Sequence, residues 1–288
     1  MLLTIYNQIN NFLLTVFSLI KVLLFSNLFQ RIKPINQTLD CLILGNGPSL
    51  KSLIRNNYEF LKNKDLFCVN YFPLTSLYEE LRPKYFITSA PELWRDDLNS
   101  NYIDESKKLF ETIKNKTNWE LSIFIPFEAK KYKTWKKFIE ENKAIKINYY
   151  NVTYVDGFYW FREIMYKYQL GMPRVQNVLI PAIMIAIRLG YKNIYLWGAD
   201  HSWLSEIKVD ENNNVLVCQK HFYDEESATY QKMRKLNGTR KLHEVLYKFM
   251  HTFKSYHYIE EFASKNNINI YNATPNSYID AFKRIKMS

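Results

Sequence analysis

The sequence predicts an α/β protein with a Rossmann-like, mostly parallel sheet and helices on both of its faces. Three observations lead to this class. Short apolar segments alternate with segments that suit helices, each short apolar segment ends in small or polar residues, and glycine marks two of those ends. At 288 residues, 47% of them hydrophobic, the chain is long enough to bury the core of one large domain.

The first predicted strand, residues 40–45, ends abruptly at the turn Gly45-Asn46-Gly47-Pro48-Ser49, and a helix is expected over 49–63. The chain has only 7 glycines, so two of them within one turn are informative. A strand that breaks at glycine and restarts as a helix leaves backbone N–H groups at the carboxyl edge of a sheet, where phosphate binds. The turn therefore predicts a ligand that carries phosphate. Pro48 removes one donor, which argues against a dinucleotide cofactor.

Three further strands are expected in the first half of the chain, at residues 66–70, 85–89 and 122–126. The first of them ends at Asn70 and the second at Ser89. Residues 127–170 are rich in lysine and aromatic residues, and their pattern assigns no element.

The clearest α/β unit lies in the second half. Residues 177–189 predict a helix, because its proline lies near the first turn, where proline is tolerated, and because Gly190 suits the C-cap. A strand follows at 193–197 and closes on Gly198-Ala199-Asp200. This arrangement is typical of one half of a nucleotide-binding fold.

The remaining residues predict a lid, a helix and a last strand. Residues 201–240 are polar and without periodicity, which indicates a long loop, and the lid is taken to extend to about residue 245. A helix is expected over 247–265 and a strand at 268–271, before the polar segment that ends in Pro275-Asn276-Ser277. Because the carboxyl ends of parallel strands share one edge, a ligand site is expected there. Its first members are the strand-end residues Asn46, Asn70, Ser89, Asp200 and Asn276.

Residues 1–34 predict a separate membrane-associating helix, before a domain that covers 35–288. The apolar run 12–29 contains Lys21, and polar residues recur every three or four positions to form a narrow stripe. Together with the basic residues at 31 and 33, the stripe suits a helix in the membrane interface with its basic residues at the headgroups. The expected location is peripheral, on the cytoplasmic face of the inner membrane. The alternative is a helix packed against the domain or a partner subunit.

Composition narrows the ligands further. The net charge of +11 favours an anionic membrane surface or an anionic small molecule, and no nucleic-acid-binding motif appears. The 3 cysteines lack metal-ligand spacing. No DxD pair and no P-loop motif is present, so we expect neither a metal ion nor another cofactor. The composition leaves a homo-oligomer open.

The turn at residues 45–50 resembles the start of the bacterial lipooligosaccharide sialyltransferases of glycosyltransferase family 42. The resemblance covers residues 40–280, is weak in 95–170 and 201–245, and is absent in 1–35. Three more segments match in the same order: residues 68–70, residues 173–200, and the segment from His251 to Ser277.

The resemblance implies an inverting, metal-independent enzyme of lipopolysaccharide biosynthesis. Such an enzyme moves sialic acid or a related nonulosonate from a CMP-sugar to a glycan or glycolipid acceptor. It implies His251 as the general base and Arg174 as the partner of the sugar carboxylate. Residues 201–203 depart from the family's lid tyrosines, and Tyr223 is the nearest substitute as a donor to the departing phosphate. The implied nucleotide-binding residues are Gly45, Asn46, Gly47, Ser49, Asn70, Ser89, Asn177, Gly198, Asp200, Pro275, Asn276 and Ser277.

Two alternatives stay open at this stage. Pterin pyrophosphokinase-like proteins and flagellin-glycosylation factors have a comparable Gly-x-Gly-Pro-Ser turn, and they would need Mg²⁺ and ATP. A membrane-bound binding protein without enzymatic activity is the other alternative.

Overall fold

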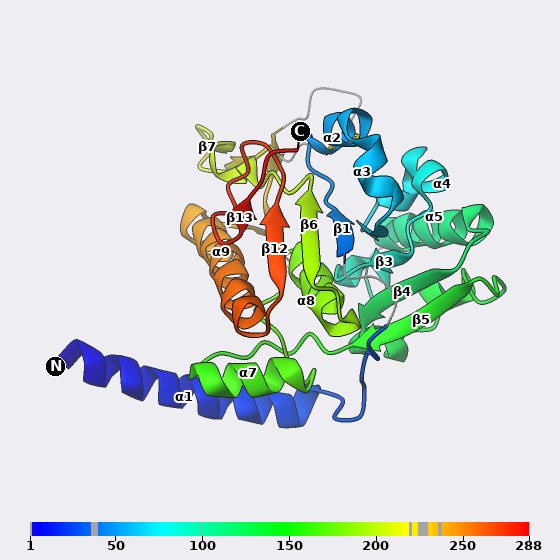
Figure 1. Cartoon of the computed structure of the whole chain (residues 1–288). Coiled ribbons are helices and arrows are strands. Elements are labelled where there is room, and N and C mark those ends of the chain that lie inside the picture. Colours follow the sequence, from blue (N-terminus) through cyan, green and yellow to red (C-terminus); the bar gives the residue numbers. More distant parts are fainter. Residues whose placement is uncertain are drawn as a thin grey trace.

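The computed structural model of the chain describes residues 2–35, 40–98, 100–218, 221–223, 230–235 and 238–287. Its centre is an eight-stranded sheet in the order β13-β12-β6-β1-β2-β3-β4-β5, in which all neighbouring strands are parallel (Figure 1). The predicted α/β class is therefore confirmed, with a sheet that is parallel throughout. The strands are β1 (Asp40–Leu44), β2 (Asp65–Val69), β3 (Tyr85–Ile87), β4 (Leu121–Pro126), β5 (Ile145–Tyr150), β6 (Asn193–Trp197), β12 (Asn269–Asn272) and β13 (Lys283–Arg284).

Strand β1 lies at the point where the strand order reverses. The chain continues from β1 to β2 on one side, whereas β6 pairs with β1 on the other side. Leu44, the last residue of β1, is opposite Cys68 of β2 and Trp197 of β6. In open parallel sheets, such a reversal leaves a crevice outside the carboxyl ends of the strands, and ligands bind there.

Helices cover both faces of the sheet. One face packs a hydrophobic core against α2 (Leu50–Asn56), α3 (Tyr58–Lys62), α4 (Leu77–Leu81), α5 (Ser100–Lys116) and α6 (Thr134–Lys137). The other face packs against α7 (Tyr159–Lys167), α8 (Leu179–Leu189) and α9 (Leu242–Lys265), with a contribution from α1 (Leu2–Phe25). Short 3₁₀ helices connect some of these elements: η1 (Phe72–Leu74), η2 (Pro91–Leu93), η3 (Phe127–Lys131) and η4 (Ser202–Leu204).

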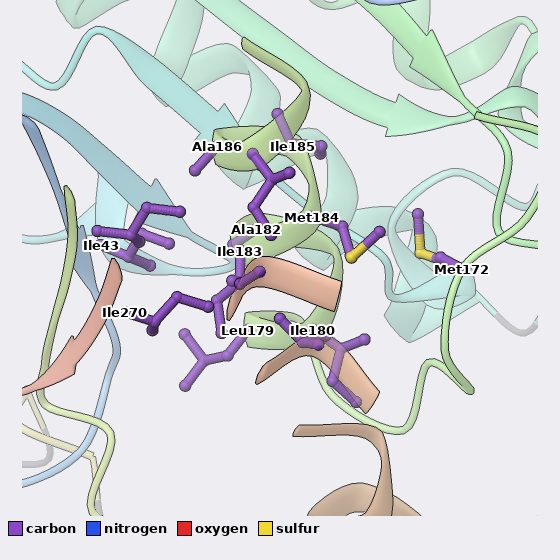
Figure 2. Close-up of a cluster of buried hydrophobic side chains, with 14 of the residues drawn as sticks. Ile43, Met172, Leu179, Ile180, Ala182, Ile183, Met184, Ile185, Ala186 and Ile270 are labelled. Atoms are coloured by element: carbon purple, nitrogen blue, oxygen red, sulfur yellow. The ribbon is translucent and has the colours of Figure 1, made fainter. Parts of the chain in front are cut away.

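Helix α8 forms the centre of the second core. Every one of its 11 residues is buried, because it packs between the sheet and α9. Figure 2 shows its side chains around Ile43 of β1 and Ile270 of β12. The helix ends at Gly190, which has the left-handed φ of 97° that the C-cap prediction required. This packing fixes the loop before α8 and the strand β6 after it, and both border the crevice.

Several element predictions were wrong in detail. The helix expected over 49–63 is two short helices, interrupted at Asn57. Residues 127–170, which had no assignment, contain β5 and α7. Residues 201–240 are not an irregular loop, because they include an antiparallel sheet of β7 (Ile207–Val209), β8 (Val215–Val217) and β9 (Gln231–Lys232), and the pair β10 (Arg234–Lys235) and β11 (Gly238–Thr239).

Helix α1 is 24 residues long and lies beside α7, with its first turns projecting past the domain (Figure 1). By length and composition it is apolar enough to cross a membrane. Its polar stripe contacts the domain: Ser18 Oγ accepts a hydrogen bond of 2.9 Å from the Asp156 backbone N–H, and Thr15 Oγ1 accepts one of 3.0 Å from Phe158. On this side the stripe faces protein, as the alternative of a helix packed against the domain expected, since these hydroxyls satisfy backbone donors before α7. The expected contact of the helix with the membrane stays a prediction.

Candidate functional site

A cavity of about 570 Å³ lies at the carboxyl ends of the parallel strands, at the reversal beside β1. Residues that follow four strands line it: Asn46 after β1, Asn70 after β2, Ser89 after β3, and Asp200 after β6. The expected convergence of polar strand ends is thus present for these four. The volume is in the range of small-molecule sites.

Two asparagines at the strand ends have side-chain oxygens without a protein partner. Asn46 Nδ2 donates to the Val69 carbonyl at 3.1 Å, which fixes the orientation of its amide. Asn46 Oδ1 and Asn70 Oδ1 are buried and accept no hydrogen bond from any described residue. A buried amide oxygen without a donor costs free energy, so both are suited to accept a hydrogen bond from a ligand.

The glycine turn does not offer the row of free backbone N–H groups that the sequence suggested. Gly45 N–H donates to the Trp197 carbonyl at 2.7 Å and Gly47 N–H donates to the Gly198 carbonyl at 2.8 Å. A Cβ at Gly45 would lie 2.5 Å from the Gly198 oxygen, and one at Gly198 would lie 2.6 Å from the Gly45 oxygen. The glycines are needed because the turns after β1 and β6 touch each other. Their contact with a nucleotide stays a prediction.

Asp200 occupies the place beside this turn. Its Oδ2 accepts a hydrogen bond of 2.9 Å from the Ser49 hydroxyl, and a Cβ at Gly47 would lie 1.9 Å from the same atom. Burial raises the pKa of Asp200, and the hydrogen bonds from Ser49 oppose that rise. No described lysine, arginine or histidine lies within ion-pair distance of Asp200. Asp200 is thus one of three carboxylates on the lining, with Glu92 and Glu206, and none of the three forms an ion pair with a described residue.

His201, the next residue, is buried and also lines the cavity. It has a left-handed φ of 54°, its Nε2 shares a hydrogen bond of 2.6 Å with the Tyr256 hydroxyl, and its ring lies 4.0 Å from that of Trp203. Asn177 holds the same tyrosine at 2.9 Å and caps α8 through its Oδ1, which accepts from the Leu179 N–H. Burial lowers the pKa of His201 to about 3, so the ring is neutral.

Two cations line the same cavity and form no ion pair with a described residue, although the Glu92 carboxylate also lies on the lining. Lys248 comes from α9 and Arg240 precedes that helix. Burial and the Arg240 charge lower the pKa of Lys248, and the Glu92 carboxylate opposes this. Two positive side chains on one cavity attract an anion, such as phosphate or a sugar carboxylate. Sequence reasoning missed both residues. Lys248 is recognised only in the structure, which shows the side of α9 that faces the cavity.

The predicted lid contributes to the cavity through its described residues. A small hydrophobic cluster of Val215, Val217, Val245 and Phe249 attaches the β7–β9 sheet to α9. Phe222 N–H donates to the Asn46 carbonyl at 3.0 Å, which places residues 221–223 over the glycine turn. His221 lines the cavity, and the ring of Tyr223 stacks on it at 5.0 Å. Tyr223 itself is not among the lining residues.

His251 and Arg174 lie together, beside the cavity and not on its lining. On α9, Lys248 and Thr252 face the cavity, whereas the His251 ring packs edge-on against Tyr247 at 4.3 Å. Arg174 Nη1 donates to the hydroxyl of the same tyrosine at 3.2 Å. The Nε2 atom of His251 is buried without a described hydrogen-bond partner. Burial, followed by the charges of Arg174 and Lys254, lowers the pKa of His251. The base role that the resemblance implies stays a prediction.

The Pro275-Asn276-Ser277 segment lies behind the site. Pro275 and Asn276 border a different hollow, next to α2. Ser277 Oγ donates to the Ala199 carbonyl at 2.6 Å, and Tyr278 N–H donates to the Asp200 carbonyl at 2.9 Å. The segment thus braces the turn that carries Asp200. The expectation that Asn276 shares the rim with the other strand ends was wrong, because the segment after β12 turns behind the Asp200 turn and places Asn276 at the second hollow.

Among the described residues, no cluster of three or more histidine, cysteine, aspartate or glutamate side chains is arranged to hold a metal ion.

The predicted site residues divide into residues that line the cavity, residues that support the lining, and residues that lie outside it. Gly45 and Ser49 support the lining without belonging to it. His251, Arg174 and the 275–277 segment lie outside it. Seven predicted residues line the cavity: Asn46, Gly47, Asn70, Ser89, Asn177, Gly198 and Asp200.

No protein-family model and no curated protein matches the chain. A solved structure, the MAf glycosyltransferase from Magnetospirillum magneticum AMB-1, aligns with 91% of this chain at a TM-score of 0.48 and 10% sequence identity. The chain spans about a third of that protein's length, since 35% of it is covered. At this level of similarity the alignment does not bear on activity.

Proposed function

We propose that this protein is a glycosyltransferase that uses a nucleotide-activated sugar. The observation that carries the proposal is one cavity, at the reversal of a parallel sheet, that combines a partly buried carboxylate with two cations, none of which forms an ion pair with a described residue. Asp200 supplies the carboxylate, and Lys248 and Arg240 supply the cations. A donor with a phosphate and several hydroxyl groups has the matching charges and hydrogen-bonding groups.

Each part of the donor has a counterpart in the cavity. In this proposal the phosphate of the donor binds at Lys248 and Arg240, because its negative charge offsets the repulsion between the two positive side chains. The base or ribose donates hydrogen bonds to the free side-chain oxygens of Asn46 and Asn70. In the finer form of the proposal the donor is a CMP-linked acidic sugar, as the family 42 resemblance implies, and the acceptor is a glycan or glycolipid.

The transfer needs a group that takes the acceptor's proton. The acceptor oxygen forms a bond to the anomeric carbon, the bond from that carbon to the phosphate oxygen breaks, and the nucleotide leaves with both electrons. Asp200 lines the cavity and His251 does not, so we expect the Asp200 carboxylate to receive the proton. Its raised pKa makes it a stronger base than an exposed aspartate.

The first test measures the melting temperature with CMP, UMP, GDP and ATP. A ligand at about 100 times its Kd stabilises the folded chain by roughly 2.7 kcal/mol. We expect the largest rise with CMP, a smaller rise with Lys248→Gln, and the full rise with Lys51→Gln, an exposed lysine on α2. A rise with ATP alone, dependent on Mg²⁺, would instead favour the pyrophosphokinase alternative, and no rise with any of the four would refute a nucleotide donor.

The second test separates the two candidate bases. With CMP-sialic acid as donor, Asp200→Asn should lower kcat by about 10² or more, because the amide cannot accept the proton. His251→Ala should leave kcat within a few-fold if Asp200 is the base. The opposite ranking, with both variants folded as judged by circular dichroism, would return the base role to His251.

A further inference from the structure

The outer face of α1 is a large apolar surface without a protein partner among the described residues. The side chains that face away from the domain are exposed along its whole length, from Leu2 at 83% to Phe25 at 72%, and Phe29 just after the helix is 92% exposed. Only Ser18 and Val22 of this helix are buried. An exposed apolar surface of this extent indicates an interaction site.

The attachment of α1 to the domain determines which face is free. Gly157 approaches the helix so closely that a Cβ there would lie 2.2 Å from Thr15 Oγ1 and 2.9 Å from the Asn11 carbonyl oxygen. The Ser18 and Thr15 hydroxyls accept backbone hydrogen bonds at the same place. Because this side is occupied by protein, lipid can reach only the other side while α1 stays in place. Crossing a bilayer would require all sides of the helix to leave the domain.

Helix α7 adds to the apolar surface. It lies beside α1 (Figure 1), and Trp160, Ile164 and Tyr168 are exposed at four-residue spacing along it. Tryptophan and tyrosine are favoured at the boundary between lipid tails and water, since their rings are apolar with one polar group.

Basic residues accompany the surface. Arg31 and Lys33, after α1, are exposed and make no ion pair with a described residue. A hollow of about 690 Å³ at the end of α1 is lined by Lys21 and Lys131, with Glu128 as the one acidic residue. This excess of positive charge beside an apolar face complements anionic headgroups, which attract basic residues by about 1 kcal/mol each.

We infer that α1 and α7 form a membrane-binding surface, with α1 lying in the plane of an anionic bilayer and remaining attached to the domain. The occupant is the lipid bilayer, with its phosphate headgroups at Arg31 and Lys33. This inference is independent of the proposed transferase activity. It also differs from an anchor that crosses the membrane.

The binding test uses the full chain and sedimentation with vesicles. Binding should be tighter to phosphatidylcholine vesicles that contain phosphatidylglycerol than to phosphatidylcholine alone, and should weaken with salt. The triple variant Phe12→Glu/Phe17→Glu/Leu24→Glu should bind at least about tenfold more weakly, because charged groups replace apolar side chains that the bilayer would bury. Leu246→Glu, at an exposed leucine of α9, is the matched control and should bind as the unchanged protein does.

The orientation test uses Leu2→Cys. The cysteines of the chain are buried, so a membrane-impermeant maleimide should label this new residue selectively. With the protein bound to the outside of vesicles, labelling without detergent indicates a helix in the plane, whereas labelling only after detergent indicates a crossing helix and contradicts the inference. Equal vesicle binding by the triple variant also overturns it. So does a dimer that the triple variant dissociates without loss of vesicle binding, because the surface then joins two copies.

Discussion

At the scale of single residues, His201 links the cavity to the stability of the fold. Its Nε2 is bonded to Tyr256, and the buried ring is neutral because burial lowers its pKa to about 3 from the ordinary 6.5. A histidine whose pKa is lower in the folded protein than in the unfolded chain contributes its full stability above the unfolded-state pKa. This contribution is lost as the pH falls from the unfolded-state pKa toward the folded-state pKa. The relevant window therefore extends from about pH 6.5 down to about pH 3.

We therefore predict that acid destabilises the protein partly through His201. Between pH 7 and pH 5, His201 should lower the free energy of unfolding by about 2 kcal/mol, since the unfolded chain binds a proton that the folded chain excludes. His201→Gln keeps a hydrogen-bonding side chain but does not titrate. Urea unfolding at several pH values should show a smaller loss for this variant than for the unchanged protein. Identical losses would show that the ring is protonated in the folded state.

Individual site residues differed in how well the sequence predicted them. Asn46, Asn70 and Asp200 were predictable because each follows an apolar strand, and the carboxyl ends of parallel strands meet. Lys248 was not, because its place on the cavity depends on the rotation of α9 about its axis. His251 is only three residues further along, yet it packs against Tyr247 beside the cavity, whereas Phe249 and Thr252 join Lys248 on the lining.

At the scale of elements, the turns after β1 and β6 act as a pair. Gly45 and Gly198 are in backbone contact, and Gly198 has a left-handed φ of 65°. The sequence marked both turns as unusual, but the contact between them was not foreseen, and the phosphate contact expected at the first turn stays a prediction. The glycines allow close packing of two turns, and Ser49, at the start of the helix after the first turn, donates its hydroxyl to Asp200 of the second turn at 2.9 Å.

We predict that Gly198→Ala is much more destabilising than Gly190→Ala. Both positions have left-handed φ angles, but a Cβ at Gly198 would lie 2.6 Å from a backbone oxygen, whereas one at Gly190 meets only ordinary contacts at 3.7 Å. The second change should cost about 1 kcal/mol and the first roughly 2 kcal/mol more. Thermal unfolding measures the difference. Equal melting temperatures would mean that the two turns can move apart.

At the scale of the whole molecule, one sheet separates two surfaces with different expected partners. The cavity lies at the carboxyl ends of the central strands, and α1 and α7 carry the apolar surface (Figure 1). The loop before α7 connects them, since Asp156 contacts Ser18 of α1 through its backbone and Lys254 and Tyr258 of α9 through its carboxylate.

At this scale we predict that chelation leaves transferase activity intact. Lys248 and Arg240 already provide positive charge for a departing phosphate, and the sequence contains no DxD pair. Activity on a CMP-sugar should be within about twofold with and without EDTA. A loss that added Mg²⁺ restores would contradict both the proposed role of the two cations and the resemblance to family 42.

The sequence by itself determined the parallel α/β sheet, the polar strand ends at one edge and the amphipathic character of residues 1–34. These features depend on local periodicity and on the geometry that all parallel strands share. Only the tertiary structure decided which residues meet in the cavity and which side of α1 is free. Those outcomes depend on how helices rotate and pack against the sheet, and a one-residue step turns a helical side chain by about 100°. That is why Thr252 faces the cavity and His251 does not.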